Sequence, residues 1–236
     1  IQRERIDVAV KMIGGPGLKV LDVGCGDGAI SELIHNNGNE CWGMDLLAVV
    51  ATVPAERSES WLHCLSVDAS KKPWKSDLSE ELVPPEFFDV VFAGEIIEHM
   101  IDLEPFLTEA WRVLKPDGRL VLTTPNAVRA LNRIAMLFGE VSTWHEWQNI
   151  PHHVRYFTPR TLQEAVAKYG FRPEQMSFGR SQAEGSDIGF DDSWLNQLAP
   201  DERAVLVKLL GRVCKDPVWR HSMIVMSSRK EVKPAG

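Results

Sequence analysis

The sequence has few of the features that mark secreted, membrane-spanning or strongly basic proteins. Its 236 residues include four cysteines, far apart and without a Cys-x-x-Cys pair, which indicates neither a disulfide framework nor a zinc site. No apolar run approaches the ~18 residues that a membrane-spanning helix needs, and no signal peptide is recognisable. The net charge of −7 argues against a broad nucleic-acid interface, although a local basic patch stays open. We expect reduced thiols, a cytoplasmic location and no membrane span.

What is present is the composition of an ordinary globular domain. Apolar residues make up 44% of the chain and charged residues 25%, which is enough for one hydrophobic core in a chain of this length. No internal repeat or low-complexity tract divides the sequence. We therefore predict a single domain over residues 1–236.

Short β-prone segments alternate with amphipathic ones along the chain. This alternation predicts a doubly wound α/β fold, in which a mostly parallel sheet is covered by helices on both faces. The clearest helix follows Asp102, which can cap it, and residues 115–118 are expected to turn the chain afterwards. A further helix over 159–169 begins at the capping residue Thr158. The seven expected strands cover residues 19–23, 41–45, 63–67, 88–93, 119–124, 174–180 and 222–228.

Two segments exceed what a minimal sheet of this kind needs. Residues 127–157 follow the fifth expected strand, and residues 181–221 separate the last two. Ligands of open α/β sheets bind at the carboxyl ends of the strands. We therefore interpret these segments as helical lid insertions, the first of them lying over the substrate; additional packing surface is the alternative.

The most informative stretch is Leu-Asp-Val-Gly-Cys-Gly-Asp-Gly, residues 21–28. A short apolar strand ends at Asp22, three glycines follow at a spacing of two, and a helix begins at Ala29. Such a turn lets backbone N–H groups approach a bound ligand closely. The spacing differs from the Gly-x-Gly-x-x-Gly of dinucleotide-binding proteins. The acid before the glycines favours a ligand with a positive group.

This stretch resembles the first motif of the class I S-adenosylmethionine-dependent methyltransferases, and later residues match that family in order from about Val20 to Phe171. The resemblance implies that Asp22 lies near the ammonium of S-adenosylmethionine. Asp45 then accepts the ribose hydroxyls, and Asp68 accepts from the adenine amino group. The expected cofactor-binding residues are Asp22, Gly24, Cys25, Gly26, Asp45, Leu46, Asp68, Ala69 and Gly94.

Each of these acids has a structural alternative, because aspartate is common at strand ends, where it caps turns. A nicotinamide dinucleotide is the other cofactor to weigh, since an acid ~20 residues beyond the glycines also suits that ligand. The glycine spacing argues against it. Three acids at three successive strand ends favour S-adenosylmethionine.

The fourth expected strand is followed by Glu95, Glu98 and His99. A helical turn starting near Glu95 places these three side chains on one face, near the methyl group to be transferred. We expect a catalytic role for them, with His99 as the general base. The structural alternative is that the helix dipole stabilises the two acids, by about 0.3–1 kcal/mol each, and that His99 bonds to a backbone carbonyl.

The Glu-x-x-Glu-His pattern also resembles that of ubiquinone-biosynthesis O-methyltransferases and of small-RNA 3′-terminal 2′-O-methyltransferases. In the latter, such residues and a later histidine bind a divalent ion. The resemblance implies an Mg²⁺ or Mn²⁺ site made of Glu95, Glu98, His99 and His153. Such an ion lowers the pKa of a bound hydroxyl. Many small-molecule methyltransferases carry these residues without a known metal role, and His153 would then cap a turn or contact the substrate.

We expect the chain to methylate a hydroxyl group of a small-molecule acceptor with S-adenosylmethionine. One alternative is metal-dependent 2′-O-methylation of an RNA 3′ end, against which the acidic charge and the lack of an appended RNA-binding domain count. A second is a non-catalytic module that binds S-adenosylmethionine, against which the Glu-x-x-Glu-His residues argue. The sequence leaves open the acceptor, the atom that is methylated and the oligomeric state.

Overall fold

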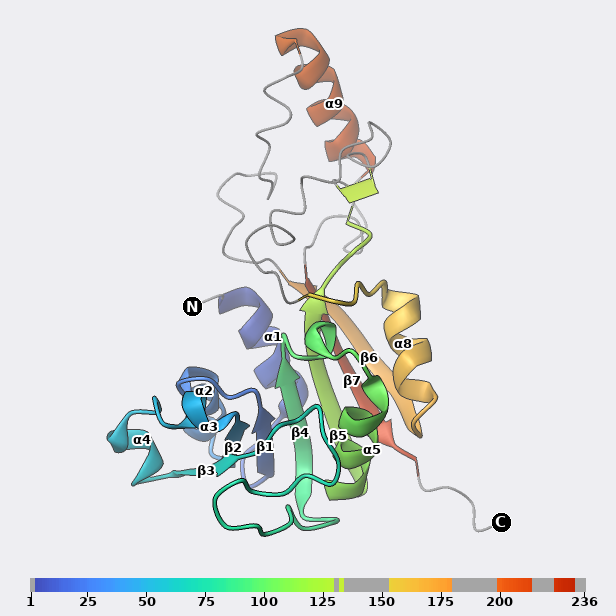
Figure 1. Ribbon diagram of the computed structural model, residues 1–236. Helices are drawn as coiled ribbons and strands as arrows, with labels where there is room; N and C mark the ends of the chain where they lie inside the picture. Colours follow the sequence, from blue (N-terminus) through green and yellow to red (C-terminus); the bar gives the residue numbers. More distant parts are fainter. Residues whose placement is uncertain (1–2, 130–131, 134–152, 180–198, 214–222, 232–236) are drawn as a thin grey trace.

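A computed structural model describes residues 3–129, 132–133, 153–179, 199–213 and 223–231 (Figure 1). The described helices are α1 (Arg3–Ile13), α2 (Ala29–Asn36), α3 (Leu47–Val50), α4 (Ala55–Ser58), the 3₁₀ turn η1 (Ile97–His99), α5 (Leu103–Val113), α8 (Pro159–Ala167) and α9 (Pro200–Val213). The strands are β1 (Lys19–Val23), β2 (Glu40–Asp45), β3 (Leu62–Ser66), β4 (Phe88–Gly94), β5 (Leu114–Pro125), β6 (Phe171–Gly179) and β7 (Met223–Lys230).

The strands form one seven-stranded sheet in the order β3-β2-β1-β4-β5-β7-β6. Only β7 runs antiparallel to its neighbours, β5 and β6. The strand order reverses between β1 and β4, which puts a crevice at the carboxyl ends of these two central strands. The predicted doubly wound, mostly parallel sheet of seven strands is confirmed.

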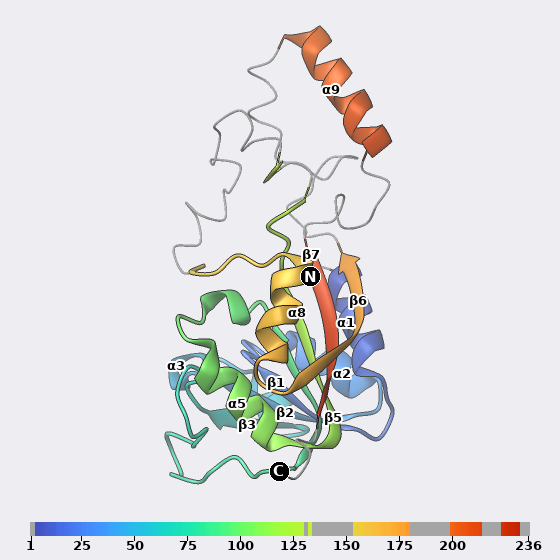
Figure 2. The ribbon, with the colours of Figure 1, turned by 90° about the vertical axis from the view of Figure 1, so that its right-hand side faces the viewer.

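The sheet separates two apolar cores, as the alternating side chains of its strands require. Val20 and Val90 face α1 and α2, whereas their neighbours Leu21 and Val91 face α5 and α8. Phe106 of α5 is fully buried on this second side. Figures 1 and 2 show the two pairs of helices on opposite faces of the sheet, with α9 beyond its carboxyl edge.

The predicted helix starts are confirmed. Asp102 caps α5 by accepting the N–H of Glu104 at 3.0 Å. Thr158 caps α8 in a reciprocal arrangement with Thr161, whose N–H donates to the Thr158 hydroxyl at 3.1 Å. These caps fix where the two helices that cover the second face begin.

The predicted turn at residues 115–118 lies within the bounds of β5 and not before the strand as expected. β5 begins at Leu114, which pairs with Phe88, and the register shifts between this pair and Val90. Asp117 has a positive φ of 61° within the strand. The turn-forming residues therefore produce a bulge-like irregularity inside β5, because pairing with β4 begins before them.

Most of the two predicted lid insertions lies outside the described residues. Residues 134–152 and 181–198 belong to this part, so the lid stays a prediction. Within the described ranges, no helix has the length and apolar character needed to cross a membrane. The three described cysteines, Cys25, Cys41 and Cys64, form no disulfide.

Replacing Thr158 by alanine should remove the cap of α8 and lower the free energy of unfolding by about 1 kcal/mol. In a chain of this size, this corresponds to a fall in Tm of about 2–4 °C. Thermal unfolding followed by circular dichroism checks it. Gln163→Ala, at an exposed position of the same helix, is the control and should leave Tm nearly unchanged. Equal Tm values for both variants would contradict the capping role.

Candidate active site

The predicted glycine-rich turn lies between β1 and α2, at the carboxyl edge of the sheet. Its three glycines have positive φ angles of 75°, 57° and 81°, which side chains other than glycine rarely adopt. A Cβ atom at Gly24 would lie 2.1 Å from the Ile96 side chain, whereas one at Gly26 would meet nothing within 4 Å. Gly24 is thus fixed by packing against the segment after β4, and Gly26 leaves open space beside the turn.

Asp45 is held at the end of β2 by two backbone groups. The N–H of Gly26 donates to its Oδ2 at 3.0 Å, and the N–H of Leu46 donates to its Oδ1 at 2.7 Å. Each carboxylate oxygen can accept a second hydrogen bond. The side chain of the neighbouring Leu46 is half exposed, at 50%. Asp45 is therefore oriented by the glycine turn while still able to accept from a ligand.

Asp22 lies beneath the same turn and is buried, with 2% exposure. The Ser31 hydroxyl of α2 donates to its Oδ2 at 2.6 Å. Burial raises the pKa of Asp22 from 3.8 to about 7, the Ser31 bond opposes this, and the charge of Asp45 adds to it. This carboxyl group therefore changes charge near neutral pH.

Asp68 follows β3 and caps the turn after it. The N–H and hydroxyl of Ser70 donate to its Oδ1 at 3.0 and 2.6 Å, and Lys71 Nζ lies 3.0 Å from its Oδ2. Burial opposes ionisation of Asp68, but these partners outweigh it and hold the pKa of the carboxyl below its usual value. Asp68 thus caps a turn in this structure, as the structural alternative proposed. Its contact with the adenine of the cofactor stays a prediction.

The remaining predicted cofactor residues occupy the same edge. Cys25 is buried, and burial raises the pKa of its thiol far above the usual range, so it acts as a packing residue. The carbonyl of Ala69 accepts from Trp74 Nε1 at 3.3 Å. Gly94 ends β4, where a Cβ atom would lie 2.8 Å from the Phe92 ring.

The helical turn predicted to start at Glu95 is wrong. Glu95 has a positive φ of 60°, and the 3₁₀ turn η1 begins only at Ile97. Glu95 therefore does not share a helix face with Glu98 and His99. Its Oε1 accepts from the Thr123 hydroxyl at 2.9 Å and pairs with Arg5 Nη1 at 3.0 Å.

Glu98 is the buried centre of the site, with 1% exposure. The Thr124 hydroxyl donates to its Oε2 at 3.0 Å, and its Oε1 has no hydrogen-bond partner within the described part of the chain. Burial raises the pKa of Glu98 well above its usual value, and the charge of Glu95 adds to this, against the opposing effect of Arg5. A buried carboxylate oxygen without a partner is a ready ligand for a cation.

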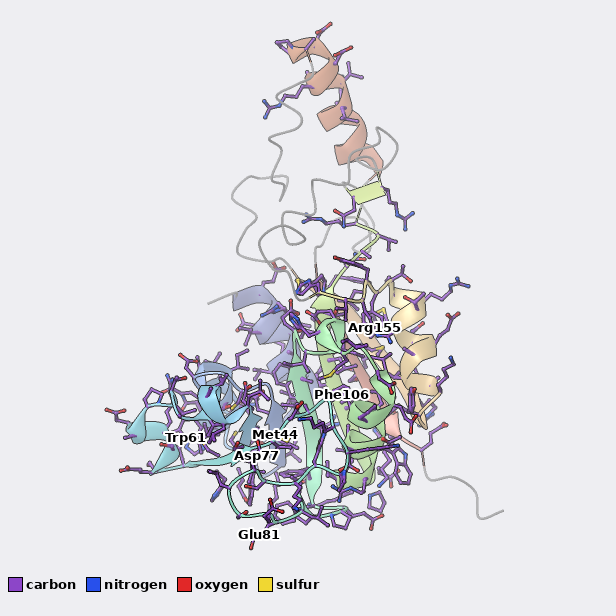
Figure 3. All side chains as sticks on the ribbon, viewed as in Figure 1. Met44, Trp61, Asp77, Glu81, Phe106 and Arg155 are labelled. Atoms are coloured by element: carbon purple, nitrogen blue, oxygen red, sulfur yellow. The ribbon has the colours of Figure 1, made fainter. Side chains whose placement is uncertain are left out.

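His153 is brought beside η1 by backbone hydrogen bonds. The Glu98 carbonyl accepts the N–H groups of Val154 and Arg155 at 2.9 and 3.1 Å. Arg155, at the upper edge of the sheet in Figure 3, donates to the Met100 carbonyl at 2.7 Å. The rings of His99 and His153 then lie 4.6 Å apart. Glu98, His99 and His153 each offer one ligand atom, all within 4.8 Å of one another.

The structure therefore brings together three of the four residues predicted to bind a metal, and Glu95 is not in this group. Sequence reasoning missed Arg5, Thr123 and Thr124, which contact the two glutamates. The threonines could have been found from their place at the end of an expected strand. Arg5 carries no such signal, because a charged residue in an amphipathic helix is expected to face solvent.

The match to known proteins agrees with this geometry. Residues 3–176 match the family model described as a methyltransferase domain. The chain belongs to the class I S-adenosylmethionine-dependent methyltransferases.

Its relatives in this methyltransferase family include the mitochondrial ubiquinone biosynthesis O-methyltransferase of Bos taurus, 35% identical over 69% of this chain and 44% of that protein. The ubiquinone biosynthesis O-methyltransferase of Cereibacter sphaeroides is 30% identical over 66% of this chain and 61% of that protein. The chain thus spans about half the length of these relatives. An S-adenosylmethionine-dependent methyltransferase structure from Mesorhizobium loti has a TM-score of 0.59 at 17% identity, covering 95% of both chains, and shares the fold.

In this methyltransferase, Asp22 should make stability fall as pH rises. Its pKa of about 7 in the folded state exceeds 3.8, so the unfolded chain releases the proton first and stability is lost between about pH 4 and 7. Relative to Asp22→Asn, the free energy of unfolding should fall by about 4 kcal/mol at most over this range. Urea unfolding at several pH values measures it.

Asp27→Asn, at an exposed acid of the same turn, is the control for this series. Its stability should follow that of the unaltered chain with pH. Parallel curves for the unaltered chain and Asp22→Asn would show that the Asp22 carboxyl is not perturbed.

Proposed function

We propose that this chain transfers the methyl group of S-adenosylmethionine to a hydroxyl group of a small-molecule acceptor. The observation that carries the proposal is the cluster of Glu98, His99 and His153 beside the glycine-rich turn, with Ile96 packed against Gly24 between them. The cluster thus lies next to the loop that would hold the methyl donor. The names of the O-methyltransferase relatives support the same chemistry.

In this proposal the residues of the first two strand ends bind the cofactor. Asp45 accepts the ribose hydroxyls with the lone pairs that its two backbone partners leave, and the turn at 24–28 lies along the methionine part. Asp22 lies below the turn and is ionised by a nearby ammonium, since an opposite charge lowers a carboxyl pKa. Asp68 and the N–H of Ala69 would contact the adenine if the Ser70 and Lys71 contacts rearrange.

The reaction itself is an in-line displacement. The acceptor oxygen forms a bond to the methyl carbon, the carbon–sulfur bond breaks, and S-adenosylhomocysteine leaves. The acceptor hydroxyl also has to lose its proton. The chain's part is to align the two reactants and to favour the deprotonated oxygen.

We propose that Glu98, His99 and His153 favour that oxygen by holding a divalent cation. The Glu98 Oε1 atom has no other described partner, and two imidazoles complete a donor set that suits Mn²⁺ better than Mg²⁺, which prefers oxygen. Such a cation, when bound, lowers the pKa of a coordinated hydroxyl. His99 acting directly as a general base is the competing assignment.

The two insertions extend this proposal. β5 and β6 end, and β7 begins, at the carboxyl edge, so residues 127–157 and 181–221 both leave the sheet there. In Figure 2, α9 stands beyond this edge. We propose that these segments of the single domain cover the acceptor.

Replacing Asp45 by alanine should weaken binding of S-adenosylmethionine about 10- to 100-fold, because hydrogen bonds to a charged group contribute about 1.5–3 kcal/mol. Isothermal titration calorimetry measures the affinity. Asp7→Ala, at an exposed acid of α1, is the control and should bind normally. If the unaltered, folded chain gives no binding heat, the proposed function fails; if Asp45→Ala binds as tightly, only the role of Asp45 fails.

Removing divalent ions with EDTA should abolish methyl transfer to phenolic acceptors, and added Mn²⁺ should restore it. Glu98→Gln and His153→Ala should each weaken Mn²⁺ binding at least about tenfold, with S-adenosylmethionine affinity within about threefold. His63→Ala, an exposed histidine on β3, is the control. Activity that resists EDTA would favour His99 as the base. Transfer to a short RNA but to no small molecule would overturn the acceptor class.

A further inference from the structure

Arg5 is a nearly buried cation in the first helix, far in sequence from the residues it contacts. Its side chain is 7% exposed, and its Nη1 lies 3.0 Å from Glu95 Oε1. The end of β6 fixes its position, since a Cβ atom at Gly179 would lie only 2.8 Å from Arg5 Cα. The helix backbone therefore lies directly against the sheet at this point.

Glu95, the partner of Arg5, has an unusual backbone conformation. Its φ of 60° lies in the left-handed region, which is unfavourable for a residue with a side chain because the Cβ atom crowds the backbone. Three contacts oppose this cost. The Glu95 N–H donates to the Thr123 carbonyl at 3.1 Å, the Thr123 hydroxyl donates to the carboxylate, and Arg5 pairs with it. A strained residue held from several sides beside a candidate site indicates a functional constraint.

The strained residue is also the one predicted ligand that stays out of the cluster. The ligand atoms of Glu98, His99 and His153 lie within 4.8 Å of one another, and Glu95 is not among them. The charges of Glu95 and Arg5 nevertheless act on Glu98 in opposite directions. Arg5 therefore offsets the charge of Glu95 at short range. Without Arg5, the carboxylates of Glu95 and Glu98 would attract a cation together.

We infer that Arg5 is a positioning residue, whose guanidinium holds Glu95 in its strained conformation and out of the cation site made by Glu98, His99 and His153. The inference rests on the cation site of the proposed function. It makes α1 part of the active centre. Glu95 is then the ion-pair partner of Arg5, and not the metal ligand that the sequence pattern implies.

The test is the affinity of each variant for Mn²⁺ added alone, measured by calorimetry, with S-adenosylmethionine binding measured separately. Arg5→Met should bind Mn²⁺ at least about tenfold more tightly, because a repelling charge is lost and the Glu95 carboxylate is released to the cation. Arg5→Met combined with Glu95→Gln should return to within about threefold of the unaltered chain. Arg5→Lys, which keeps the charge, should stay near it.

Glu95→Gln alone gives a second test that does not depend on the stability of Arg5→Met. It should keep Mn²⁺ affinity within about threefold, whereas loss of a true ligand would weaken binding at least about tenfold. Lys11→Met removes an exposed cation from the same helix. It is the matched control, and its Mn²⁺ affinity should not change.

Folded Arg5→Met with unchanged or weaker Mn²⁺ binding overturns the inference, as does a tenfold loss in Glu95→Gln. If the unaltered chain binds no Mn²⁺ but Arg5→Met does, the native cation site fails and the inference that rests on it is overturned. If neither binds Mn²⁺, the inference is overturned. Binding of S-adenosylmethionine in the same samples shows separately whether the proposed methyltransferase function stands.

Discussion

The geometry of the site depends on one peptide carbonyl, that of Glu98. It accepts two backbone N–H groups from the segment that returns to the sheet before α8, at Val154 and Arg155. This contact joins residues more than fifty positions apart and places His153 against η1. Glu98 also supplies a buried carboxylate. Its carbonyl thus fixes the position of His153, and its carboxylate lies close enough to the two imidazoles to bind the same cation.

Charge balance is the second constraint on this edge of the sheet. The charge of Glu95 is close enough to raise the pKa of Glu98, and burial already disfavours the ionised form of Glu98. Arg5 compensates one of the two carboxylates. Within the described residues, Glu98 has a hydrogen-bond partner, the Thr124 hydroxyl, on only one of its two carboxylate oxygens. Two neighbouring acids with such different environments are typical of sites in which each acid has a different role.

Much of the fold could be predicted from the sequence, because it depends on local patterns. Buried strands are continuous apolar runs, and glycines that need positive φ, such as Gly24, carry their own signal. The turn expected at residues 115–118 lies inside a strand, because pairing with β4 already begins at Leu114. Tertiary pairing of this kind has no signature within a short window.

The candidate site was predictable in its residue types and less so in its geometry. Spacing placed Glu95 on a helix face, but its left-handed backbone follows from contacts with Thr123 and Arg5, which lie on other elements. Asp68 is the opposite case, because its contacts are local. Its partners are Ser70 and Lys71, which follow it closely in the sequence. Motif spacing thus identifies chemically relevant residues, and long-range contacts decide which of them act together.

The antiparallel strand β7 has a consequence for the order in which the molecule is made. It lies between β5 and β6 and contacts α1. Residues 3–13 leave the ribosome before every described strand, and residues 223–230 leave it after all the other described strands. The first helix therefore lacks part of the surface it packs against until β7 has been made.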